Sequence, residues 1–208
     1  GGPVGLEGIL PYLLLIVAPF ASTLLALRWF ADGDAHAQPT TRLALIGRWK
    51  AVDRATATAN PLYGVNGIMV SLLVGMMLNV PFRPLEYWAS LHAISGNVPA
   101  WLSTLHMAMT FDVVLFTSLY MIAFVAALRR VPLFPRLLAA IWICDLATQL
   151  VIAKIVANSV GLPPAVADAL HGLLEGNSKK VLISIGLWLP YLLLSRRVNV
   201  TYRHRIPA

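Results

Sequence analysis

The sequence predicts an all-α integral membrane protein, a bundle of about five transmembrane helices with short amphipathic helices at the membrane surface. Hydrophobic residues make up 58% of the 208 residues, and charged residues only 12%. Soluble domains carry about 25% charged residues. The mean hydropathy is +0.73, and several apolar runs reach the roughly 20 residues that a helix needs to cross a bilayer. We therefore expect one membrane-embedded domain, residues 1–208.

The first two expected spans are long apolar runs. Residues 8–30 carry no charge before Arg28. Pro11 and Pro19 should kink this helix without ending it, because a spanning helix tolerates proline. Residues 62–80 carry no charged side chain at all, so they form the second candidate.

The last three expected spans contain or adjoin charged residues. Residues 101–128 open with Trp101, an aromatic residue typical of the headgroup zone, and end before a pair of arginines. Residues 137–156 follow as the fourth span. Residues 179–195 hold a short apolar run, but the basic side chains at both ends are long enough to reach the headgroups.

Two further segments have the pattern of surface helices. In residues 33–60, Leu45, Trp49 and Val52 follow one another at helical spacing beside basic residues, which is typical of a helix lying on the membrane. Residues 163–178 begin with two prolines and alternate leucines with acidic residues and histidine in the same way. We expect a short interfacial helix in each segment.

The basic residues predict the orientation. With five spans, twelve lysines and arginines fall on one side; the other side receives only Lys179, Lys180 and Arg83, the last in an expected headgroup-zone loop, residues 81–99. This bias predicts an extracytoplasmic N-terminus and a cytoplasmic C-terminus. The twelve are Arg28, Arg42, Arg48, Lys50, Arg54, Arg129, Arg130, Arg136, Arg196, Arg197, Arg203 and Arg205.

Small residues recur on the second span. Gly67, Ser71 and Gly75 are spaced by four, which places them on one helix face where another backbone can approach closely. The neighbour is either another helix of the same chain or a helix of a second protein. The sequence leaves both possibilities open.

Ionisable and polar residues inside the spans are the main functional candidates, because such groups are costly in lipid. Asp112 lies on the third span, and Asp145, Gln149 and Lys154 lie on the fourth, with His106 nearer one end of the third. Asp145 and Gln149 are one helical turn apart and share a face. These residues form either a proton or ion relay or a neutral, paired structural contact, with Lys154 joining a carboxylate or extending to the interface.

Recognised enzyme and cofactor motifs are absent from the sequence. No phosphate-binding glycine-rich loop or nucleophile elbow occurs, and the lone Cys144 excludes an intrachain disulfide and a cysteine-based metal cluster. We expect no cofactor and no bound metal. A metal site built from His92, His106, His171 and Glu175 is the one remote alternative.

The C-terminal segment resembles a known bacterial family. Residues 188–202 read Trp-Leu-Pro-Tyr-Leu-Leu-Leu-Ser-Arg-Arg-Val-Asn-Val-Thr-Tyr, and residues 129–136 contain Arg-Arg followed by Phe-Pro-Arg. Both are similar to the inner-membrane family catalogued as domain of unknown function 2569, and the Gly-rich start at residues 5–8 is similar too. This resemblance implies a bacterial inner-membrane location. The sequence departs from the family between residues 38 and 99, where it has an additional expected span.

The basic tail and the lack of enzyme motifs shape the functional hypotheses. Pro190 should bend the last helix and direct the tail along the membrane, where four arginines would bind lipid headgroups. We expect partners to be lipids and other membrane subunits or a second copy, and no nucleic acid. The first hypothesis is a non-enzymatic accessory or scaffolding subunit; the alternative is a small proton- or ion-coupled transporter that uses Asp112, Asp145 and Lys154. The four tail arginines are Arg196, Arg197, Arg203 and Arg205.

Overall fold

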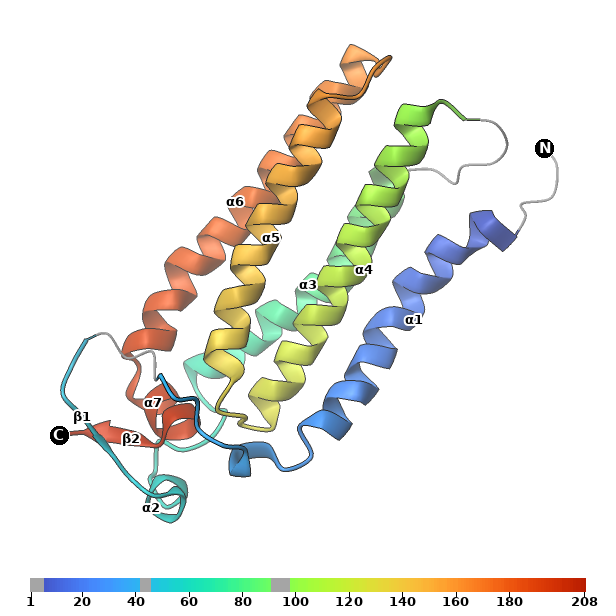
Figure 1. Cartoon of the computed structure of the whole chain (residues 1–208). Coiled ribbons are helices and arrows are strands. Elements are labelled where there is room, and N and C mark those ends of the chain that lie inside the picture. Colours follow the sequence, from blue (N-terminus) through green and yellow to red (C-terminus); the bar gives the residue numbers. More distant parts are fainter. Residues whose placement is uncertain (1–5, 42–45, 91–97) are drawn as a thin grey trace.

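The computed structural model describes residues 6–41, 46–90 and 98–208, and within them the chain is mostly helical (Figure 1). The long helices are α1 (Leu6–Trp29), α3 (Ile68–Ser90), α4 (Ala100–Leu128), α5 (Phe134–Ala157) and α6 (Pro164–Leu194). Four of them, α1, α3, α4 and α5, are long and apolar enough to cross a membrane; α6 adds a fifth if it is counted with the helix that follows it after a bend. The predicted all-α membrane bundle is confirmed.

Three of the expected spans are close to the helices of the structure. Helices α1, α4 and α5 begin and end within three residues of the predicted limits. Pro11 and Pro19 both lie inside α1, as expected for a spanning helix. Long apolar runs locate these helices well because lipid requires every backbone group to be bonded within the segment.

The second span is shifted along the chain relative to the prediction. Helix α3 begins at Ile68, after a turn in which Gly64 and Gly67 adopt positive φ angles of 104° and 63°. It continues through Pro81 and Pro84 to Ser90. Residues 81–90, which were expected in a loop, are therefore helical. Each proline removes one backbone donor, and the helix continues through both of them.

The last expected span and the expected surface helix before it are one helix. Helix α6 runs for 31 residues, and its first half carries the polar residues that suggested a separate interfacial segment. The separate helix at residues 163–178 is therefore wrong. Pro190 lies inside α6, and the 70° bend follows it at Ser195, where α7 (Arg196–Arg203) begins.

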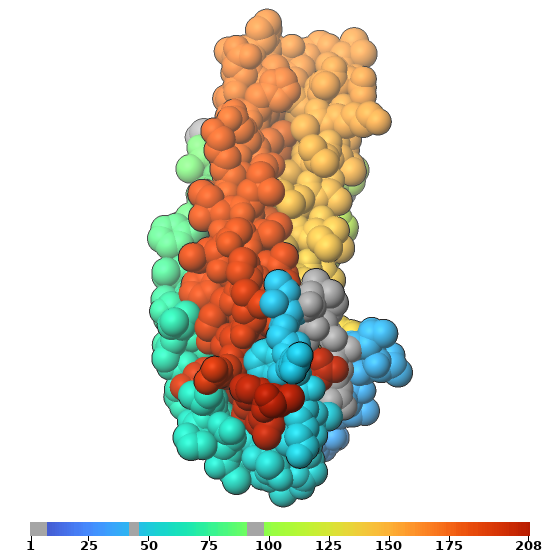
Figure 2. Space-filling model, turned by 90° about the vertical axis from the view of Figure 1, so that its left-hand side faces the viewer, coloured from blue at the N-terminus to red at the C-terminus, as the bar shows by residue number. Residues whose placement is uncertain are grey.

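The bundle has two parts that meet at the centre. Helix α4 packs against α1 and α3, helix α5 packs against α6, and the contact of α4 with α5 joins the two groups. Figure 2 shows α6 between α3 and α5 on one face of the molecule. Large apolar side chains cover the outside: Phe20, Ile143 and Leu150 are 69%, 67% and 71% exposed. Such a surface matches lipid rather than water.

A small folded cap closes one end of the bundle (Figure 1). We call the cap the described residues of 31–66 together with residues 195–208. It contains the short helices η1 (Gly33–Ala35) and α2 (Arg54–Thr58), and strand β1 (Trp49–Ala51) pairs antiparallel with β2 (Arg205–Pro207). The amphipathic helix expected around Trp49 and Val52 is therefore wrong, because this segment pairs as a strand; Leu45 lies outside the described residues.

Helix α7 anchors the cap in the bundle core. Val198 and Tyr202 are buried, and the Tyr202 hydroxyl donates a hydrogen bond of 2.9 Å to the carbonyl of Ala127 at the end of α4. The Ser195 hydroxyl accepts from the backbone N–H of Val198 and caps α7. The C-terminal tail is thus part of the fold and does not lie loose on the membrane.

Because the tail is folded into the cap, not all of its arginines can bind lipid headgroups as expected. Arg203 is buried and donates 2.7 Å to the carbonyl of Leu192, so its expected contact with lipid headgroups is wrong. Arg197 donates 3.0 Å to the carbonyl of Leu62. Arg196 is exposed and Arg205 half-buried, and their binding of headgroups stays a prediction.

A polar network ties the first cap segment to α2. Asp34 accepts hydrogen bonds from Arg54, at 2.7 Å, and from the Tyr63 hydroxyl. Burial would raise the pKa of Asp34, but the bonds from Arg54 and Tyr63 outweigh it and hold that pKa below its usual value. Burial, followed by the bond to Asp34, raises the pKa of Tyr63 to about 12. Arg130 lies 5.3 Å from the centroid of the Tyr63 ring.

We predict that Asp34→Asn destabilises the cap by about 1 kcal/mol, a fall of roughly 2–4 °C in melting temperature. A lowered folded-state pKa adds stability above the unfolded value of 3.8, and that stability is lost as the pH falls through the folded value. Thermal unfolding in detergent should therefore separate the two proteins at pH 7, and the difference should begin to shrink only below about pH 4 and vanish once the pH is below the lowered folded-state pKa. A difference that stays the same down to the lowest pH would contradict this role of the Asp34 carboxylate.

Candidate functional site

Four polar side chains from three helices meet in the middle of the bundle. Arg83 comes from α3, Asp112 from α4, and Asp145 and Gln149 from α5. We call these four residues the buried cluster. Their exposed fractions are 8%, 1%, 0% and 2% in that order. Asp145 is eleven residues from the start of the 24-residue α5, about 16 Å along the helix, so the cluster lies at mid-membrane depth.

Arg83 holds both carboxylates. Its two terminal nitrogens donate 2.9 Å and 2.6 Å to the two oxygens of Asp145, a bidentate pair. Its Nε lies 3.4 Å from Oδ2 of Asp112. The guanidinium also lies over the ring of Phe116, 4.8 Å from the centroid. Because the bond to Asp145 is shorter and double, Asp112 is the more weakly held acid.

Gln149 and Tyr120 complete the hydrogen bonds of the cluster. The Gln149 amide donates 3.0 Å to Asp112 and 3.3 Å to Asp145, so it bridges the two acids. The Tyr120 hydroxyl donates 3.3 Å to Asp145. The side-chain amide oxygen of Gln149, Oε1, is buried without a hydrogen-bond partner among the described residues.

Helical spacing explains how the sequence brings these groups together. Asp145 and Gln149 are four residues apart on the inner face of α5. On α3, the buried positions Met76, Arg83 and Tyr87 recur at intervals of seven and four residues, which keeps them on one face. The sequence pattern indicated the acids and Gln149, but Arg83 was expected in a loop. Two intramembrane acids with only one cation, Lys154, in the expected spans were the signal that could have located it.

Two other predicted residues lie outside the cluster. The hydroxyl of Tyr87 shares hydrogen bonds with Nε2 of His106, at 2.9 Å, and with Thr110, at 2.8 Å. Lys154 is exposed and forms no ion pair with any residue that the structure describes. The expected pairing of Lys154 with a carboxylate is therefore wrong within residues 6–41, 46–90 and 98–208, and Arg83 takes that place.

The small-residue face does not pack inside the chain. Gly67 precedes α3, while Ser71 and Gly75 are exposed on the helix. A side chain added at Gly75 would meet no atom within 4 Å. Among the described residues, no helix packs closely at Ser71 or Gly75, so the expected packing within the chain is wrong at these two positions. An interface with a second protein stays a prediction.

The metal alternative has no support in the described residues. Across them, no group of three or more histidine, cysteine, aspartate and glutamate side chains is arranged to hold a metal ion. His92 lies outside the described residues. His106 is instead bonded to Tyr87.

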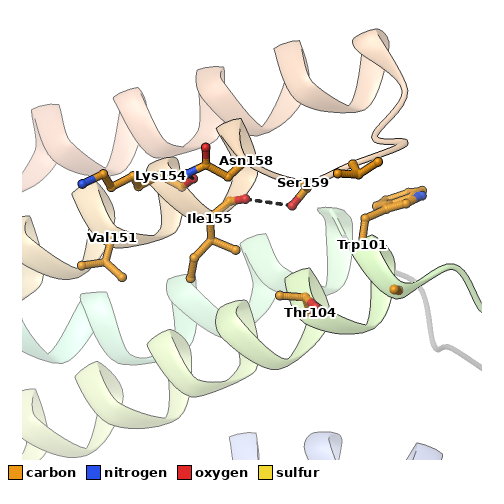
Figure 3. Close-up of a pocket in the computed structure, with 9 residues that line it drawn as sticks. Trp101, Thr104, Val151, Lys154, Ile155, Asn158 and Ser159 are labelled. Carbon is orange, nitrogen blue, oxygen red and sulfur yellow. Dashed lines mark hydrogen bonds between the residues drawn. The ribbon is translucent and has the colours of Figure 1, made fainter.

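Within the part of the chain that the structure describes, clefts open on the sides of the bundle. The α3–α6 cleft has a volume of about 320 Å³, and Arg83 and Asp145 form part of its wall together with Asn79, Glu86 and Lys180. It leads to the buried cluster. The α4–α5 cleft, of about 520 Å³, lies at the end of the bundle opposite the cap and is lined by Trp101, Thr104, Lys154, Asn158 and Ser159 among others (Figure 3). In Figure 3 the Lys154 side chain extends along α5 away from Trp101.

Comparison with known protein families, with curated proteins and with solved structures finds no match for this chain. The resemblance of the C-terminal segment to a known family therefore stays a prediction. The assignment of function depends on the geometry of the cluster and the clefts.

We predict that Arg83→Met strongly destabilises the protein, because it leaves two buried carboxylates without their cation. Removal of one partner from a buried pair costs about 3–5 kcal/mol. The yield of monodisperse protein extracted from membranes should fall, and the double variant Arg83→Met with Asp145→Asn should recover part of it. A double variant no better folded than Arg83→Met would contradict the pairing.

Proposed function

We propose that this multi-span membrane protein is a small proton-coupled carrier, and that the buried cluster is its proton-binding site. The observation that supports the proposal is the charge of the cluster. Two carboxylates, Asp112 and Asp145, share one guanidinium at membrane depth. With both acids ionised the cluster carries one net negative charge in a medium that disfavours charge. One bound proton makes it neutral.

Asp112 is the better proton acceptor of the two. Asp145 keeps a bidentate pair with Arg83, a bond from Tyr120 and one from Gln149, so protonation there would weaken four favourable contacts. Asp112 has one contact of 3.4 Å with Arg83 and one bond from Gln149. Protonation of the less stabilised carboxylate costs less, since hydrogen bonds to the ionised form favour that form.

The position of the cluster links proton binding to the shape of the bundle. Arg83 and Asp112 belong to the part formed by α1, α3 and α4, whereas Asp145 and Gln149 belong to the part formed by α5 and α6. The proton therefore changes the attraction between the two parts. A carrier needs this dependence, because a ligand shifts an equilibrium only through different contacts in its two states.

Orientation and location complete the proposal. We infer that the cap faces the cytoplasm, with the N-terminus extracytoplasmic, because the basic residues gather at the cap end. A bacterial inner membrane agrees with the resemblance of the C-terminal segment. Arg196 and Arg205 of the cap would then meet anionic headgroups.

A second candidate function is the accessory or scaffolding subunit. The open surface beside Gly75 supports it, because a helix of another protein could approach closely there. Recovery of other membrane proteins in fixed ratio with this chain after mild extraction, measured by native mass spectrometry, would favour the subunit. Recovery of the chain alone would favour the carrier.

We predict that a pH jump across liposomes containing the purified protein produces a transient current on a solid-supported membrane, as protons bind the cluster. Asp112→Asn should reduce the charge moved at least tenfold, since it removes the proposed acceptor. Lys154→Gln is the matched control, because it also removes a charge from a span but lies outside the cluster. Equal currents from wild type, Asp112→Asn and empty liposomes would contradict the proposal.

A further inference from the structure

We propose that the α3–α6 cleft is a water-filled route by which protons reach the buried cluster, and that the ion pair of Glu86 with Lys180 closes its mouth. The inference rests on the proposed function for its biological role. Its physical content, water at membrane depth beside Asp145, can be tested independently of transport.

The wall of the cleft is more polar than a lipid-facing surface allows. Asn79 and Glu86 from α3 and Asn177 and Lys180 from α6 line it, and Asp145 lies behind them. The side-chain amide oxygen of Asn79, Oδ1, is buried, with no hydrogen-bond partner among the described residues. A buried polar atom of this kind requires water or a ligand, and a polar cleft of about 320 Å³ has room for several waters.

The ion pair at the mouth supports the same conclusion. The side chains of Glu86 and Lys180 contact each other and are 35% and 59% exposed. Lys180 is fourteen residues before the end of α6 at Leu194, about 21 Å along the helix from the cap end. Glu86 lies four residues before the end of α3 at Ser90, and the exposed ion pair of Lys179 with Glu175 lies beside Lys180 on α6. In a bilayer core about 30 Å thick, the pair of Glu86 with Lys180 therefore lies near the edge opposite the cap, where exposed charges meet water, and the cleft leads from there to the buried cluster.

The route ends at the buried cluster, of which Asp145 and Arg83 line the cleft. A hydronium ion in the cleft gives its proton to a carboxylate oxygen of the cluster, the O–H bond of the hydronium breaks, and a water molecule stays behind. The charged and titratable groups around Asp145 are Arg83 from α3, Asp112 and Tyr120 from α4, and Lys180 with Glu86 at the mouth. With both acids ionised, this set carries one net negative charge, which attracts a cation.

Cysteine accessibility tests the route. In a Cys144→Ala background, Asn79→Cys and Asn177→Cys would be exposed in native membranes to a positively charged, membrane-impermeant methanethiosulfonate, which reacts only with thiolate in water. The matched controls are Val74→Cys on α3 and Ile183→Cys on α6, at positions 50% and 68% exposed on the apolar outside. We expect the cleft cysteines to react at least tenfold faster than the controls.

The result that would overturn the route is equal, slow labelling at all four positions. Labelling of the cleft cysteines only after detergent extraction would also overturn it, because a partner helix would then cover the cleft in the membrane. All variants would first be checked for monodisperse behaviour, and the two cleft positions serve as independent tests if one variant fails to fold.

A second substitution tests the closing role of the ion pair. Glu86→Gln removes the attraction to Lys180, so labelling of the Asn79→Cys variant should become several-fold faster. An unchanged rate would overturn the closing role. Fast labelling without a pH-jump current would keep the water route and reject the carrier, whereas a current with slow labelling would keep the carrier and reject this route.

Discussion

The cost of a guanidinium in the middle of a membrane constrains the rest of this structure. Insertion of an arginine at the centre of a span costs about 2.5–3.5 kcal/mol on biological scales, and Arg83 offsets that cost only where its five donors find acceptors. The bidentate pair with Asp145 and the contact with Asp112 supply acceptors for three of these donors. Helices α3, α4 and α5 therefore have to meet at one depth, and α3 has to continue past Pro81 to bring Arg83 there.

The other contacts of the bundle are arranged around this point. Towards the cap, apolar side chains fill the contact of α4 with α5, with Phe116 and Phe134 fully buried. Tyr202 closes that core from α7 by its bond to the carbonyl of Ala127. Away from the cap, a second apolar core that includes Leu15, Tyr87 and Leu105 joins the helices. The buried cluster thus lies between two apolar cores, and the clefts open on the sides of the bundle.

The sequence predicted the parts of the fold that depend on local composition. Long apolar runs located α1, α4 and α5, and the acids Asp112 and Asp145 were identified because charge is rare in a span. What failed depends on distant parts of the chain. Whether Arg83 faces headgroups or two buried acids is decided by α4 and α5, and the pairing of Trp49 with Pro207 joins residues that are far apart in the sequence. No local pattern carries that information.

A purely structural role of the cluster does not explain the second acid, Asp112. One carboxylate, Asp145, is enough to neutralise Arg83 and takes both of its terminal nitrogens. Asp112 adds a second buried negative charge that gains only a contact of 3.4 Å and one amide bond. An apolar or amide side chain would stabilise that position better, because buried charge without full compensation is unfavourable. The proposed proton-binding role accounts for Asp112, because a carboxyl group that alternates between neutral and ionised forms can serve there. In that proposal, the polar cleft beside Asp145 holds the water from which the proton comes.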